Sequence, residues 1–289
     1  MITRNRMFST AVALAATVAL AGTAAAQTAL DLPRPSPKAT VTQTVGLTEV
    51  AIAYCRPGVK ARTIWGGLVP YDQVWRTGAN EATTITFADE ATIAGTKVAP
   101  GTYGLFTIPG KDEWTVILNK GAKLWGAYEY TQADDVLRFK VAPQKAEFSE
   151  LLTCAFTAVT PDQAEIALTW EKVRVAFKIG FATTNKVLAS ARKAIAEAKA
   201  DDWRTPYRAA AFCLDSGINL DEAATWLDAS TKASETFYNV FGRARLAALK
   251  GDKVNALTLA KKAIEVGNAA QPKADVAPAE AFLKEMTAK

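Results

Sequence analysis

The chain has 289 residues, of which 49% are hydrophobic and 22% are charged, and its formal net charge is +5. So small a positive excess, without a dense basic run, excludes any argument for a nucleic-acid partner. The sequence contains 0 histidines, which excludes Ser-His-Asp and Cys-His mechanisms and the imidazole sites that zinc, copper and non-haem iron prefer. Phosphate-loop, dinucleotide and CxxC patterns are also missing, so we expect no cofactor and no metal.

The N-terminal segment has the pattern of an export signal. Arg4 and Arg6 precede an uncharged apolar run over 8–21, which is too short to span a bilayer comfortably. Ala24-Ala25-Ala26 then supplies the small residues of a cleavage site. We predict a signal peptide over 1–26, cleaved near Ala26/Gln27, and a soluble periplasmic or secreted product. No later segment has transmembrane length, so we expect no stable membrane insertion after cleavage.

Residues 27–37 contain three closely spaced prolines and are predicted to form an extended Pro-rich leader. Residues 38–180 are rich in Val, Ile, Thr and aromatic residues, with frequent turn residues. Many short strands without helices between them predict an antiparallel β-sandwich or barrel-like domain. The predicted strands are 41–45, 48–55, 82–87, 102–108, 114–118, 136–141, 151–159, 165–170 and 172–177.

Three cysteines, Cys55, Cys154 and Cys213, can form at most one intramolecular disulfide. Cys55 and Cys154 both lie in predicted strands of the same domain. A disulfide between these two residues and a pair of buried free thiols are both compatible with the sequence.

A long connection over 56–81 concentrates Gly, Trp and Arg between two predicted strands. Long connections in compact domains are often functional, and Trp, Tyr and Arg are suited to binding sugars or acidic ligands. The opposing interpretation is a structural plug, and it is favoured because Leu68, Val69 and Val74 interleave the aromatic residues as core residues would. The candidate ligand-binding residues are Arg62, Trp65, Tyr71, Trp75, Arg76, Asn80 and Glu81.

Residues 181–289 are rich in Ala, Lys, Glu and Leu, and their apolar residues follow a helical period. The stretch 248–266 resembles a tetratricopeptide repeat, with Gly251 at the turn and Ala256 and Ala263 at close-packing positions. We predict two or three helical pairs, which would form either a partner-binding groove or a compact helical cap. The predicted helices are 185–200, 206–214, 220–230, 238–250 and 253–266.

Several longer motifs in the β-rich part carry a family resemblance. They are PSPKA at 35–39, RTIWG at 62–66, LVPY at 68–71, VWRTGANEAT at 74–83, PGTYGLFTIP at 100–109 and WEK at 170–172. In this order they resemble the DUF2911 family of exported bacterial proteins, over about residues 35 to 179. The resemblance implies export and these domain limits, and it is consistent with a helical tail. It implies no reaction and no site residues, because the family's function is unknown.

These observations predict an exported, non-catalytic binding or scaffold protein of the cell envelope, whose partner is a protein or a cell-envelope glycan. The alternative is a histidine-independent carbohydrate-active enzyme that uses paired carboxylates. Glu81, Glu113, Glu129 and Asp135 are available for that chemistry, although nothing in their spacing selects a pair.

Overall fold

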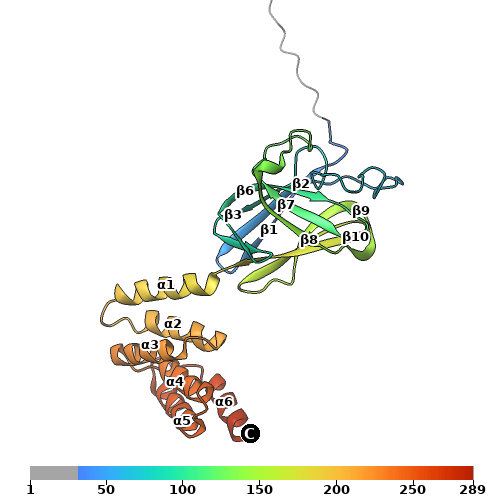
Figure 1. The fold of residues 1–289 in the computed structure, drawn as a ribbon. Helices are drawn as coiled ribbons and strands as arrows, with labels where there is room; N and C mark the ends of the chain where they lie inside the picture. Colours follow the sequence, from blue (N-terminus) through green and yellow to red (C-terminus); the bar gives the residue numbers. More distant parts are fainter. Residues whose placement is uncertain (1–31, 289) are drawn as a thin grey trace, which may run out of the picture. The chain divides into compact units, whose positions relative to one another are not determined.

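The computed structural model describes residues 32–288, which form a β domain followed in the chain by six helices (Figure 1). The predicted signal peptide and the first part of the predicted leader lie outside these residues. Residues 32–37 form neither helix nor strand. No helix in the described part of the chain is long and apolar enough to cross a membrane.

The β domain contains two antiparallel sheets, as predicted. A six-stranded sheet has the order β1-β2-β3-β6-β7-β8, and a four-stranded sheet has the order β5-β4-β10-β9. The strands are β1 (Lys38–Val45), β2 (Thr48–Cys55), β3 (Thr84–Phe87), β4 (Ala91–Ile93), β5 (Thr96–Val98), β6 (Gly101–Ile108), β7 (Trp114–Asn119), β8 (Asp135–Val141), β9 (Gln144–Thr157) and β10 (Gln163–Phe181). A short 3-10 turn at Gln132–Asp134 precedes β8.

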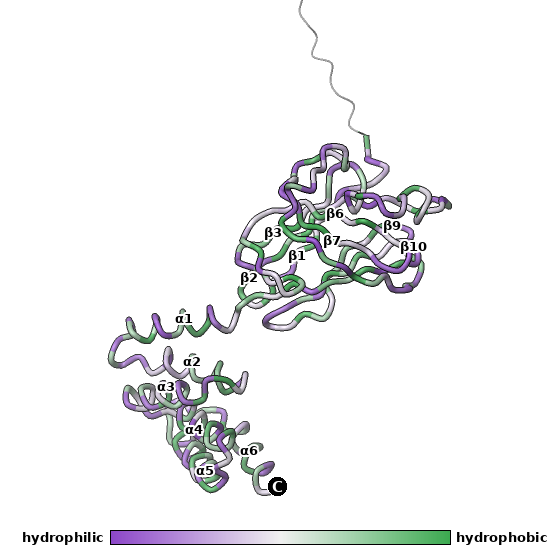
Figure 2. Tube along the Cα trace, viewed as in Figure 1, coloured by the Kyte–Doolittle hydropathy of each residue, from purple (hydrophilic) through white to green (hydrophobic). Residues whose placement is uncertain are grey.

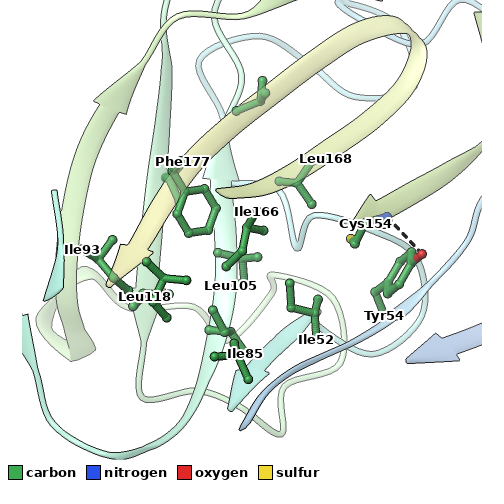
Figure 3. Close-up of a cluster of buried hydrophobic side chains, with 14 of the residues drawn as sticks. Ile52, Tyr54, Ile85, Ile93, Leu105, Leu118, Cys154, Ile166, Leu168 and Phe177 are labelled. Carbon is green, nitrogen blue, oxygen red and sulfur yellow. Dashed lines mark hydrogen bonds between the residues drawn. The ribbon is translucent and has the colours of Figure 1, made fainter. Parts of the chain in front are cut away.

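The core lies between the two sheets. Side chains alternate along each strand, so one face of β2 contributes Val50, Ile52 and Tyr54 to the core. Ile166 and Leu168 of β10 lie in the same cluster (Figure 3). The buried Tyr54 hydroxyl accepts a hydrogen bond from the Cys154 backbone N–H at 3.0 Å, which joins the two sheets. The two packed sheets form a β-sandwich.

Two strand predictions were wrong. The segments predicted as separate strands over 165–170 and 172–177 form one strand, β10, whose pairing with β9 is irregular on both sides of Glu171. Glu171 has a left-handed φ of 55°, so the expected break is a local bulge within a continuous ladder. The sequence pattern also failed to predict β4 and β5, which are only three residues each. Their connection runs through Ala94 and Gly95, which both have left-handed φ angles.

The helical part contains α1 (Thr183–Ala196), α2 (Arg204–Ser216), α3 (Leu220–Ala233), α4 (Phe237–Leu249), α5 (Lys253–Ala269) and α6 (Ala277–Ala288). Five of these correspond to predicted helices, whereas the sequence pattern did not predict α6. Its start is obscured by the prolines at 272 and 278, although proline is tolerated in the first turn of a helix. Apolar and polar stretches alternate along α1, as expected for an amphipathic helix (Figure 2).

Helix α2 packs on α3, and α4 packs on α5. The turn between α4 and α5 contains Gly251 at a φ of 81°, a conformation in which glycine avoids the strain of a Cβ. Asp252 caps α5 by accepting a hydrogen bond from the Asn255 backbone N–H at 3.0 Å. Ala256 and Ala263 are fully buried, which is consistent with close packing of this helical pair.

Candidate functional site

The connection over 56–81 is held firmly against the sandwich. Trp75 and Thr107 of β6 exchange two backbone hydrogen bonds, of 2.7 and 2.9 Å, and Gly58 pairs with Leu151 of β9. Five non-glycine residues of the connection have left-handed backbone conformations, namely Lys60, Ala61, Asp72, Thr77 and Asn80. Such conformations persist only where the surrounding structure imposes them, and they often cluster at functional sites.

Trp65 and Trp75 belong to a cluster of four tryptophans. Their ring centroids are 5.8 Å apart, and Trp65 lies 4.9 Å from Trp114 of β7. The ring of Trp75 stacks on that of Trp170 at 5.8 Å, and Trp75 Nε1 donates to the Gly78 carbonyl at 3.0 Å. Both loop rings are only partly exposed and pack against the main core. For these two residues, the geometry favours the structural plug over the ligand-binding interpretation.

Arg62 and Tyr71 also make contacts within the connection. Arg62 donates from Nη2 to the Gly58 carbonyl at 2.6 Å and from Nε to the Val59 carbonyl at 3.1 Å. The ring of Tyr71 lies against Gly66, where an added Cβ would be 2.8 Å from Tyr71 Cε2. Gly66 is therefore required for this close approach, and both predicted site residues stabilise the loop itself.

Arg76, Asn80 and Glu81 lie at the other end of the connection, next to the loop between β7 and β8. The Gly126 backbone N–H donates to the Asn80 carbonyl at 3.0 Å, and Glu81 forms an antiparallel bridge with Trp125. Asn80 Nδ2 also donates to the Ser36 carbonyl at 3.3 Å. The Arg76 Nε atom is buried and has no hydrogen-bond partner within residues 32–288. Thus the structure brings three of the seven predicted residues, Arg76, Asn80 and Glu81, to a second loop, between β7 and β8, which was not predicted as a binding segment.

This second loop presents two aromatic side chains to solvent. Trp125 is 58% exposed and Tyr128 is 85% exposed. Residues of the same loop that alternate with them, Leu124, Ala127 and Tyr130, pack against a small second core on β6 and β7. The Tyr130 hydroxyl is anchored by hydrogen bonds of 2.8 and 2.9 Å to the Asp135 carboxylate. The two exposed rings therefore belong to a loop whose inner face is anchored to the β domain.

Gly126 allows Tyr128 and Arg76 to lie close to the loop backbone. Its φ is 73°, and an added Cβ would be 2.7 Å from Tyr128 Cε2 and 3.6 Å from Arg76 Nη1. The only signal in the sequence was the run Leu-Trp-Gly-Ala-Tyr-Glu-Tyr over 124–130, which combines aromatic residues with glycine. That composition does not distinguish outward rings from buried ones.

A pocket of about 170 Å³ lies beside this loop. Glu81 lines it and accepts a hydrogen bond from Cys55 Sγ at 3.4 Å, and the other ionisable side chains that line it include Lys38 and Lys123. Directly opposite residues of an antiparallel pair project to the same face. The bridge between Glu81 and Trp125 therefore places Trp125 next to a residue that lines this pocket, although Trp125 does not line the pocket itself.

The three cysteines, Cys55, Cys154 and Cys213, are free and buried. Cys55 and Cys154 therefore do not form the disulfide that the sequence left open. Burial raises the pKa of the Cys154 thiol far above its usual value, which keeps this thiol protonated and unreactive.

The carboxylates considered for catalysis have separate surroundings. Glu113 forms an ion pair of 2.8 Å with Lys140, Glu129 is exposed, and Asp135 is held by Tyr130 and by Arg138 at 3.2 Å. Hydrogen bonds from neighbouring side chains lower the pKa of five other carboxyl groups, those of Asp89, Glu165, Asp202, Asp221 and Glu222. None of these five is among the carboxylates considered for catalysis.

Clusters of three or more metal-ligating side chains are absent from the part of the chain that the structure describes. In the helical part, a separate groove of about 610 Å³ is lined by residues of α2, α4 and α6, including Leu214, Phe241 and Phe282.

Fold and site together define a protein with an antiparallel two-sheet β domain, a helical C-terminal part, and an aromatic and charged loop surface on the β domain. Residues 36–179 match the family described as "Protein of unknown function (DUF2911)", and the chain belongs to this family through its β domain. Neither the curated proteins nor the solved structures contain a match to this chain.

Proposed function

We propose that this chain is an exported, non-catalytic binding protein of the cell envelope, and that it holds a saccharide on its β domain. The observation that carries the proposal is the outward pair Trp125 and Tyr128. The apolar face of a sugar ring stacks on aromatic rings, while the polar edges of Trp and Tyr remain available for hydrogen bonds. Large aromatic side chains that stay exposed on an anchored loop are a common feature of recognition surfaces.

Two further features support this proposal. Asn80 and Arg76 lie beside the loop and add polar groups that can orient a hydroxylated ligand. The N-terminal pattern over 1–26 predicts export by a signal peptide, which would deliver the mature chain to a compartment where envelope glycans are present. The weak net charge of +5 favours neither a nucleic-acid partner nor a strongly charged membrane surface.

The proposal is tested with the mature chain, residues 27–289, on an array of immobilised oligosaccharides. We expect binding to at least one glycan, and a loss of about tenfold or more in affinity for the double variant Trp125→Ala, Tyr128→Ala. Phe148→Ala is the matched control, because Phe148 is 55% exposed in the same domain but lies on β9. This control should bind like the wild type.

A non-catalytic binding protein should also release its ligand chemically unchanged. After incubation with the wild-type chain, the bound oligosaccharide should have an unchanged mass. Cleavage of the glycan would contradict the non-catalytic part of the proposal. Absence of binding to every glycan, or equal losses in the double variant and in Phe148→Ala, would contradict the binding part.

A further inference from the structure

The pocket beside the aromatic loop has an excess of positive charge. Two lysines, Lys38 and Lys123, line it together with one carboxylate, that of Glu81, so its charged lining sums to 2 − 1 = +1. The Glu81 carboxylate is engaged by the Cys55 thiol. Within residues 32–288, Lys38 and Lys123 form no ion pair, whereas Lys97 pairs with Glu90 and Lys140 pairs with Glu113.

The size of the pocket restricts what can enter it. At about 170 Å³ it is smaller than the pockets of about 300 to 1,000 Å³ that enclose drug-sized ligands. A single charged group with part of one sugar residue suits this volume. The ring of that sugar would remain outside the pocket, near Trp125, which pairs with Glu81 and belongs to the same loop as Lys123.

We propose that the Lys38 and Lys123 pocket binds the acidic group of an anionic sugar residue while Trp125 stacks on the ring of the same saccharide. Ammonium groups form charge-assisted hydrogen bonds with carboxylate and phosphate oxygens. The ligand class is therefore a saccharide that carries a carboxylate, as in a hexuronic acid, or a phosphate. This inference rests on the proposed function, since it specifies the saccharide that the aromatic loop holds.

Calorimetric titration of the mature chain with four probes tests the inference. The probes are a galacturonic acid trisaccharide, the neutral galactose trisaccharide of the same linkage, glucose 6-phosphate and inorganic phosphate. We expect the acidic trisaccharide to bind about tenfold or more tightly than the neutral one. A comparison of the two phosphate probes shows whether the sugar ring contributes, and a comparison of glucose 6-phosphate with the acidic trisaccharide shows which acid the pocket accepts.

The decisive variant is Lys38→Gln, Lys123→Gln, and its control is Lys111→Gln, Lys145→Gln. The control removes the same charge from exposed positions of the same domain that do not line the pocket. We expect the first variant to lose about tenfold in affinity for the preferred anionic probe and the control to lose much less. Circular dichroism of both variants should match the wild type.

The outcomes separate the two proposals. If the neutral trisaccharide binds as tightly as the acidic one, or if both lysine pairs have the same effect, the anionic-sugar inference is wrong. In that case the proposed function still stands, provided that Trp125→Ala weakens binding of the neutral probe. If no saccharide binds on the array or in the titrations, both proposals fail. If inorganic phosphate binds as tightly as glucose 6-phosphate, the part of the inference that assigns the sugar ring to Trp125 is wrong.

Discussion

Two groups of aromatic side chains in the β domain differ in their surroundings. Trp65 and Trp75 pack against Trp114 and Trp170 and against the main core. Trp125, with its neighbour Tyr128, projects into solvent from a loop whose other side is anchored. Tryptophan in a long connection is therefore not by itself a sign of a binding surface. A tryptophan ring is available to a ligand only if the sheets do not enclose it. Strands from both sheets enclose the Trp75 ring, whereas only the inner face of the loop that carries Trp125 is covered.

The strongest test of this difference is Trp75→Ala. Removal of the ring leaves a cavity between β6, β7 and β10, and we expect a loss of about 3 kcal/mol in the free energy of unfolding. Urea unfolding followed by circular dichroism measures it. A loss as small as that of Trp125→Ala would show that the tryptophan cluster does not stabilise the fold.

The anchoring of the aromatic loop can be tested at alkaline pH. Burial, followed by the hydrogen bond to Asp135, raises the pKa of Tyr130 to about 12 from the ordinary value of 10.0. The folded state therefore favours neutral Tyr130, so its stabilising contribution is complete below about pH 10 and decreases as the pH rises toward 12. Absorbance titration should show that Tyr130 ionises late, together with Tyr54 and Tyr207, whose pKa values burial also raises.

Tyr130→Phe is the control for this titration. It should reduce the amplitude of the late ionisation by one tyrosine and reduce the loss of stability between about pH 10 and 12. If the amplitude of the late ionisation is the same in Tyr130→Phe as in the wild type, Tyr130 does not ionise late and the proposed anchoring by Asp135 is wrong.

A smaller effect is expected for Gly126→Ala. The left-handed φ of 73° disfavours alanine, at a cost of about 1 kcal/mol, and the new Cβ would displace the Tyr128 ring. Gly95→Ala is the matched control, because its φ is 78° and an added Cβ meets nothing within 4 Å. Both variants should lose similar stability in urea, but only Gly126→Ala should lose affinity for a glycan. Equal glycan affinity of the two variants would show that Tyr128 does not contribute to the binding surface.

The smallest effect on stability is expected for Trp125→Ala. An exposed side chain that contributes little to the core should change the free energy of unfolding by no more than about 0.5 kcal/mol. Urea unfolding, compared with Phe148→Ala, measures this change. A cost near that of Trp75→Ala would mean that the outward ring has a structural role, and the distinction between the two aromatic groups would be lost.

Much of the fold can be predicted from local patterns in the amino-acid sequence. The predicted strands 41–45 and 48–55 flank Gly46-Leu47, a pattern typical of a hairpin. The structure has this hairpin, in which β1 and β2 pair without a break from Lys38 opposite Cys55 to Val45 opposite Thr48. The change in composition near residue 180 predicts a β part followed by helices, and β10 ends at Phe181 just before α1 starts. These features depend on local periodicity and turn residues, which a sequence displays directly.

Other features were decided only by the tertiary structure. Glu171 looks like a break between two strands, yet long-range pairing with β9 makes β10 continuous through a bulge. Likewise, the residue types over 56–81 show that Trp and Arg are concentrated there, but they do not show which rings are enclosed. Tertiary packing places Trp65 and Trp75 against the main core and leaves Trp125 and Tyr128 exposed to solvent. The physical reason is that burial depends on contacts between residues distant in sequence, and those contacts arise only when the sheets pack together.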